Sequence, residues 1–235
     1  MTKLSAVLAS LLLVAGLTGC ASTAPSASAG YTTMDKAAQS AMNADAAIAA
    51  LKSGNQRFVS GNMLKRDLMK QVKATGYNQY PLAAIVSCID SRAGPEIVFD
   101  QGIGDVFSAR VAGNFVNEDI LGSLEFATKA AGSKLIVVLG HSSCGAIKGA
   151  CDDVVLGNLT GMLAKIKPAV ASVTTTGDRS SKNDAFVQMV AEANVKRTVN
   201  EIFARSPVLK AQADAGEIKI VGAMLDVKTG VVTWY

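Results

Sequence analysis

Short apolar runs and longer amphipathic segments alternate along most of the chain. Runs rich in Val, Ile and Leu at residues 82–89, 106–111 and 135–139 predict strands. Helical patterns follow at residues 120–131, from about residue 144, at 159–172 and at 184–204. This alternation predicts an α/β fold with a mainly parallel central sheet flanked by helices.

Two further segments lie outside this alternation. The Ala-rich segment 35–59 predicts a helix that ends at Ser60-Gly61-Asn62, with Leu51, Phe58 and Val59 available for one face. The closing stretch 218–235 contains Val-Lys-Thr-Gly-Val at 227–231, which predicts a hairpin turn. We expect residues 35–235 to form one domain.

The first twenty residues have the features of an export signal. Lys3 precedes an apolar stretch that is too short to favour a stable membrane span, and Leu-Thr-Gly-Cys follows at 17–20. The pattern resembles a bacterial lipoprotein signal, which implies cleavage before Cys20 and acylation of its thiol. The alternative is an ordinary secretory peptide cut at a small residue such as Ala21 or Ala24.

Residues 21–34 have almost no large apolar side chain to bury before Tyr31, and they predict a flexible tether. We therefore expect an exported protein that is lipid-anchored in the bacterial envelope and faces the periplasm. The lipid at Cys20 would be its only contact with the membrane.

Composition limits the classes of partner. A hydrophobic content of 49% with 18% charged residues allows a substantial core within 235 residues. The formal net charge is +4, without a basic cluster or interleaved aromatic residues. Nucleic acid is therefore not an expected partner.

The chemistry of the chain gathers at the ends of two predicted strands. Cys88 follows one apolar run, while His141, the only histidine, and Cys144 follow another. Because parallel strands present their carboxyl ends along one edge of a sheet, these side chains can share one zinc ion. Two cysteines and one histidine are three ligands, which is typical of a catalytic zinc with an open fourth position.

Asp90 and Arg92 lie close to the first of these cysteines. Asp90 could orient a zinc-bound hydroxide, and Arg92 could hold the carboxylate in place. Each residue also has an ordinary structural explanation: Asp90 and Arg92 as a surface ion pair, and His141 as a hydrogen-bonded core imidazole. A Cys88–Cys144 disulfide is a further alternative, and Cys151 is interpreted as a small buried side chain outside the site that could also be a redox partner.

The residues that carry this chemistry also match a known family. From about Ala47 onward the chain resembles the β-class carbonic anhydrases, through Cys-Ile-Asp-Ser-Arg at 88–92 and His-Ser-Ser-Cys-Gly at 141–145. Supporting segments are Gly-Asn-Gln-Arg-Phe at 54–58, Pro-Glu-Ile-Val-Phe-Asp at 95–100, Gly-Asp-Val-Phe at 104–107 and Arg-Val-Ala-Gly-Asn at 110–114.

The resemblance implies a role for each matching residue. It makes Cys88, His141 and Cys144 the zinc ligands, with one zinc per subunit, and Asp90 with Arg92 the catalytic dyad. It also implies a substrate-binding set made of Gln79, Phe107, Ala112, Phe126 and Gly145. Phe126 stands where related sequences often carry tyrosine.

The activity implied is reversible hydration of carbon dioxide to bicarbonate and a proton. The resemblance further implies a homodimer or homotetramer in which an N-terminal helical arm, here 35–59, wraps a partner, although this segment could equally serve its own core. Two rivals remain at this point: hydrolysis of carbonyl sulfide or carbon disulfide, and a non-catalytic, lipid-anchored zinc or redox module.

Overall fold

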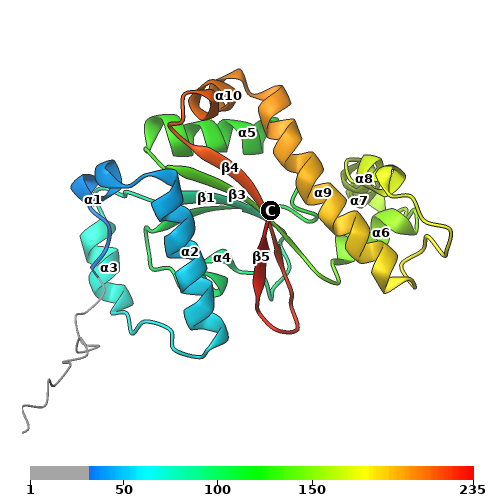
Figure 1. Cartoon of the computed structure of the whole chain (residues 1–235), viewed down its shortest axis with the longest axis horizontal. Coiled ribbons are helices and arrows are strands. Elements are labelled where there is room, and N and C mark those ends of the chain that lie inside the picture. Colours follow the sequence, from blue (N-terminus) through cyan, green and yellow to red (C-terminus); the bar gives the residue numbers. More distant parts are fainter. Residues whose placement is uncertain (1–31) are drawn as a thin grey trace, which may run out of the picture. The chain divides into compact units, whose positions relative to one another are not determined.

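The computed structural model describes residues 32–235, so the export signal, Cys20 and most of the expected tether lie outside the described residues. A five-stranded sheet in the order β2-β1-β3-β4-β5 forms the centre (Figure 1). The parallel strands are β1 (Ala83–Ser87), β2 (Val106–Arg110), β3 (Leu135–His141) and β4 (Lys219–Leu225), and β5 (Val232–Trp234) runs antiparallel to β4. The predicted α/β fold with a mainly parallel sheet is confirmed.

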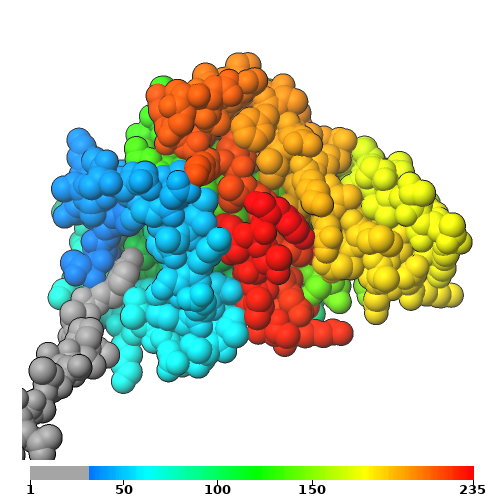
Figure 2. Space-filling model, viewed as in Figure 1, coloured from blue at the N-terminus to red at the C-terminus, as the bar shows by residue number. Residues whose placement is uncertain are grey.

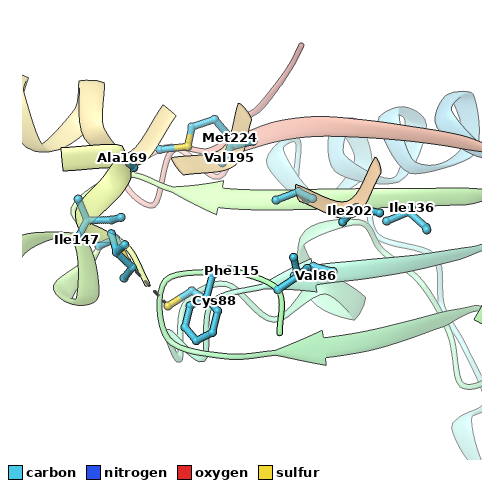
Figure 3. Close-up of a cluster of buried hydrophobic side chains, with 14 of the residues drawn as sticks. Val86, Cys88, Phe115, Ile136, Ile147, Ala169, Val195, Ile202 and Met224 are labelled. Carbon is cyan, nitrogen blue, oxygen red and sulfur yellow. Dashed lines mark hydrogen bonds between the residues drawn. The ribbon is translucent and has the colours of Figure 1, made fainter. Parts of the chain in front are cut away.

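Alternate residues of the strands face two different hydrophobic clusters. Ala84 and Val86 of β1 belong to one cluster, which packs between the sheet and the helices on one face; Figure 3 shows Val86 among the side chains of this cluster. The helices on this face are α5 (Glu118–Glu125), α6 (Gly145–Cys151), α7 (Gly157–Ala164), α8 (Lys167–Ser172), α9 (Asp184–Arg205) and α10 (Pro207–Asp214). Ala83 and Ile85 point to the other side, toward α2 (Ala44–Val59) and α4 (Pro95–Val98). Both faces of the sheet are therefore covered, as parallel sheets require.

Several predicted helices differ from those in the structure. The expected helix at 35–59 is two helices, α1 (Lys36–Ala41) and α2, because Asn43 accepts a hydrogen bond from the Ala46 N–H and begins a new helix. The expected helix at 159–172 is likewise divided into α7 and α8, and Pro168 lies in the first turn of α8. The helix at 120–131 is α5 followed by a π-helical turn at Phe126–Ala130.

Three helices were not predicted: α3 (Leu68–Thr75), α4 and α10. The hairpin at the C-terminus was predicted correctly, since Asp226 N–H donates to Val231 O and Gly230 has a φ of 77°. In the space-filling view the C-terminal strand is part of the surface between α2 and α9 (Figure 2). Within residues 32–235, no helix combines the length and hydropathy needed to cross a bilayer.

Helix α2 packs on the sheet of its own chain. Ala47 and Leu51 are fully buried against it. The Asn55 side chain donates to Val98 O and Gly230 O and accepts from Val232 N–H, so it joins the helix to α4 and β5. The expectation that this segment also wraps a partner subunit stays a prediction.

Candidate metal centre

The sheet brings the three expected ligands to one edge. β1 and β3 are hydrogen-bonded neighbours in which Ser87 lies beside Leu139, so Cys88 and His141 emerge from adjacent strand ends. Cys144 follows as the residue before α6. Between the two ligands of this loop, Ser143 adopts a left-handed backbone with φ 54°, which turns the chain sharply.

The geometry of these three side chains fits a zinc ion. Their ligand atoms all lie within 4.8 Å of one another, and all three residues are buried. The two Sγ atoms are 4.0 Å apart, close to the roughly 3.8 Å expected for two sulfurs at about 2.3 Å from a tetrahedral zinc. Both cysteines are free, so the alternative of a Cys88–Cys144 disulfide is not what the structure shows.

The histidine ring is oriented for metal binding through one nitrogen. His141 Nδ1 lies 2.9 Å from Ser142 O, and a backbone carbonyl can only accept, so Nδ1 carries the proton. His141 Nε2 is buried and has no hydrogen-bond partner. A buried ring nitrogen with a free lone pair that faces two thiols is what a zinc site requires.

The two thiols share charge unequally. The hydrogen bond from the Cys144 thiol lowers the pKa of Cys88 from 9.0 to about 4, although burial opposes this change. The same hydrogen bond, together with burial, raises the pKa of Cys144. Cys88 is thus the thiol of the pair that ionises more readily, and zinc binding favours loss of the proton from Cys144 as well.

Two residues that sequence reasoning did not single out hold Cys88 in place. The Gly113 N–H donates to Cys88 Sγ at 3.4 Å, while the Gly113 carbonyl accepts from the Asn194 side chain. Arg110 of β2 donates through Nε to Cys88 O at 2.9 Å and through Nη2 to Asp90 O at 2.7 Å. Both residues lie in the segment Arg-Val-Ala-Gly-Asn, whose only earlier signal was its match to the family.

Asp90 and Arg92 form the expected pair beside the ligands. Arg92 donates from Nε and its backbone N–H to Asp90 Oδ1, both at 2.9 Å, and from Nη2 to Oδ2 at 2.8 Å. These hydrogen bonds hold the pKa of Asp90 well below its usual range. Asp90 Oδ2 lies 3.8 Å from His141 Nε2, so an ionised carboxylate faces the ligand cluster.

The expected substrate-binding residues fall into two groups. Ala112 adjoins Gly113, and Gly145 begins α6 directly after Cys144, so both lie next to the metal centre in the chain. Phe107 and Phe126 contact each other, with ring centroids 6.1 Å apart, in a groove of about 710 Å³ beside the edge strand β2. None of the three ligands lines that groove.

Gln79 also lies apart from the ligands of its own chain. It is exposed and precedes the start of β1, whereas Cys88 follows its end. Five strand residues alone span about 16 Å. Within one chain, the structure therefore unites the ligands with Asp90 and Arg92 but leaves Gln79, Phe107 and Phe126 elsewhere.

The buried cysteines and histidine at the end of a parallel sheet, with an ionised carboxylate against them, define a catalytic zinc protein of the α/β class. A family profile described as carbonic anhydrase matches residues 83–232. Carbonic anhydrase 2 of Mycobacterium tuberculosis is 37% identical over 194 residues, which cover 80% of this chain and 91% of that protein. The chain belongs to the β-class carbonic anhydrase family.

Solved structures agree in fold. A Coccomyxa β-carbonic anhydrase in complex with acetazolamide superposes with a TM-score of 0.63 at 24% identity, over 71% of this chain and 77% of that one. One of the two tetrameric β-carbonic anhydrases of Sordaria macrospora gives a TM-score of 0.58 at 22% identity, over 71% and 89%.

Proposed function

We infer that this chain catalyses the reversible hydration of carbon dioxide to bicarbonate and a proton, with one zinc per subunit. The observation that carries the inference is the convergence of Cys88, His141 and Cys144, with the Asp90 carboxylate 3.8 Å from His141 Nε2. When bound there, zinc lowers the pKa of a coordinated water and so provides a nucleophile near neutral pH.

The residues of the chain contribute position and charge. Two thiolates and one imidazole leave a fourth side open for reactants. Asp90 is held ionised by Arg92, so its free lone pairs can accept a hydrogen bond from the reacting water and orient that water toward carbon dioxide. Arg92 itself acts through Asp90, because all three of its hydrogen bonds here end on that carboxylate.

Substitutions separate metal binding from orientation. We expect Cys88→Ser and His141→Ala to lose zinc and activity together, because each removes a ligand. Asp90→Ala should keep stoichiometric zinc while the hydration rate falls by about 10–100-fold, the usual loss when a partner of a metal site is removed. Zinc content by mass spectrometry and stopped-flow carbon dioxide hydration measure both quantities.

The exposed carboxylate Asp214, which pairs with Lys210 on α10, supplies the matched control: Asp214→Ala should keep the parental rate. A parental rate in Asp90→Ala would refute the role given to Asp90. A zinc-loaded parent without hydration activity would refute the function itself.

We further propose that two copies of the chain complete each substrate site. β2 is an edge strand, and beside it Phe126 exposes 57% of its surface in the groove that also holds Phe107. Exposed strand edges and apolar patches are typical of interfaces. Supporting this, the Sordaria relatives are tetrameric. A second copy would bring Gln79, Phe107 and Phe126 to the partner's metal centre, where Ala112 and Gly145 complete the pocket.

The N-terminal segment supports a proposal about location. We propose that the chain is exported, cleaved before Cys20 and anchored in the bacterial envelope through a lipid on that cysteine, facing the periplasm. The support is the Leu-Thr-Gly-Cys sequence after an apolar stretch. Metabolic labelling with an alkyne fatty acid should mark the parent and not Cys20→Ser. Equal labelling of both would exclude lipidation at Cys20.

A further inference from the structure

The loop that carries two zinc ligands is fastened to the turn between β4 and β5. Ser142, which follows His141, donates its backbone N–H to Leu225 O at 2.8 Å. Its hydroxyl donates to Asp226 Oδ1 at 3.3 Å and accepts from Val227 N–H at 3.0 Å. Ser142 is thus held at three points by three consecutive residues, namely Leu225 at the end of β4 and the first two residues of the turn.

The held residue is also the one that orients the metal-binding ring. The Ser142 carbonyl accepts the His141 Nδ1 proton, and this hydrogen bond decides which nitrogen is free. Ser143, the next residue, has a left-handed backbone that costs energy in a non-glycine residue. The direction of the Ser142 carbonyl therefore depends on contacts from outside the loop.

The Asp226 carboxylate is held in place for its contact with Ser142 by two further hydrogen bonds. Its Oδ1 accepts a second hydrogen bond from the Lys228 N–H at 2.8 Å, and its Oδ2 accepts from the Thr229 hydroxyl at 3.1 Å. The Lys228 N–H, with the two hydroxyl donors, lowers the pKa of Asp226, so the group is an acceptor at neutral pH. The Ser142 hydroxyl must then donate to it, which leaves a lone pair to accept from Val227.

We propose that Ser142 and Asp226 are positioning residues that aim His141 Nε2 at the zinc ion, acting through the Ser142 peptide. This inference rests on the proposed function, since it assigns these residues to the same metal centre. The C-terminal hairpin of β4 and β5 is separated from β1, the strand that leads to Cys88, by β3. The Ser142–Asp226 contact nevertheless makes this hairpin part of the zinc site.

Zinc affinity tests the inference, because it can be read without turnover. Competition with a chromophoric chelator should show about tenfold weaker zinc binding in Ser142→Ala and in Asp226→Ala, in the range typical of partners that orient metal ligands. The double variant should lose no more than the worse single variant, because both substitutions break the same contact. Ser142→Thr, which keeps the hydroxyl, should bind zinc like the parent.

A control separates positioning from the stability of the turn. Thr229→Val removes the hydrogen bond to Asp226 Oδ2 and the one accepted from the Val231 N–H but leaves Ser142 in place, so its zinc affinity should change by less than about twofold. The visible spectrum of cobalt-substituted protein should shift in Ser142→Ala and stay parental in Thr229→Val, since it reports ligand geometry.

The parent is measured first for zinc content and carbon dioxide hydration. A parent that binds no zinc would overturn the proposed function. A zinc-binding, active parent whose affinity is unchanged in both Ser142→Ala and Asp226→Ala, or lost additively in the double variant, would overturn this inference alone.

Discussion

Gly113 shows how much one backbone position contributes to the metal centre. It lies at φ 83°, and a Cβ there would stand 2.4 Å from Ile166 Cδ1. Its N–H is one of the donors to Cys88 Sγ. A side chain at this position would therefore strain the backbone and also displace a hydrogen bond from a zinc ligand.

We expect Gly113→Ala to lower both stability and zinc affinity. The left-handed backbone alone costs about 1–2 kcal/mol for a non-glycine residue, and the contact with Ile166 adds to this. Gly216 is the matched control, because its φ is 71° and nothing lies within 4 Å of its added Cβ. Gly216→Ala should show the backbone cost without loss of zinc, in chemical denaturation and chelator competition. Equal zinc affinity in Gly113→Ala and the parent would contradict the assigned contact.

At the residue scale, the zinc ligands were easier to predict than the residues that hold them in place. Cys88, His141 and Cys144 carry soft ligand atoms at predicted strand ends, so their meeting could be inferred from the sequence. Arg110, Gly113 and Ser142 act through backbone groups or on backbone groups of other segments. Their residue types carry no signal of that use, which depends on distances that only the fold sets.

At the scale of elements, Asp100, which follows α4, is bound by α2 and by the loop that contains Leu64 and Arg66. It is fully buried at φ 45° and accepts from Arg57 of α2, from Arg66 and from the Leu64 N–H. Burial alone would raise its pKa, but these donors outweigh burial and lower the pKa below its usual 3.8. Helix α2 is thus held to the segment after α4 by an ion pair, as well as to the sheet by Leu51.

This lowered pKa predicts how stability depends on pH. Because the carboxylate is favoured in the folded state, its contribution is complete above pH 3.8 and is lost as the pH falls through the lower folded value. Asp100→Asn should destabilise the metal-free protein by about 2–4 kcal/mol at pH 7, since it removes the buried carboxylate that pairs with the partly buried Arg57 and Arg66. Denaturant unfolding at pH 7 and at pH 3 should show the difference between variant and parent shrinking in acid.

Asp214→Asn, in an exposed ion pair with Lys210, should match the parent at both pH values. A difference between Asp100→Asn and the parent that is the same at pH 3 and pH 7 would show that the charge of Asp100 is not what stabilises the protein.

Elements were predictable where periodicity was strong and uninterrupted. The three strands that lead to the site were placed within two residues of their observed ends. Helix boundaries failed where a local cap decided them: Asn43 restarts a helix inside an Ala-rich segment, and Pro168 opens α8. Helix α3 was missed because many of its apolar residues, including Leu68 and Met69, face outward and give no core-facing pattern.

For the whole molecule, we expect each active site to combine the zinc ligands of one copy with the substrate-binding residues Gln79, Phe107 and Phe126 of another. Gln79→Ala and Cys88→Ser should then each disable one half of a shared site. If Gln79 serves the partner's zinc, a heterodimer of the two variants contains one intact site of two. Co-expression with two affinity tags allows the heterodimer to be purified. Its hydration rate should be about half that of the unsubstituted protein, while the homodimers of Gln79→Ala and of Cys88→Ser should both be slow.

A heterodimer no faster than the Gln79→Ala homodimer would place Gln79 outside the partner's site.

A second variant tests the surface through which the copies associate. Phe126→Glu puts a charge on an exposed apolar groove, so it should yield a zinc-loaded monomer by analytical ultracentrifugation. That copies of this chain associate could be predicted only from the family resemblance. No periodic pattern in the sequence marks a surface that meets another chain.

The two strands that supply the cysteines and histidine are far apart in the sequence and adjacent only in the finished sheet. In an unfolded chain His141 and Cys144 lie close together in sequence, whereas bringing Cys88 to them costs the entropy of closing a long loop. Capture of the metal is therefore favoured once β1 and β3 have paired. We expect the compartment in which this chain completes its folding to be the one that supplies its zinc.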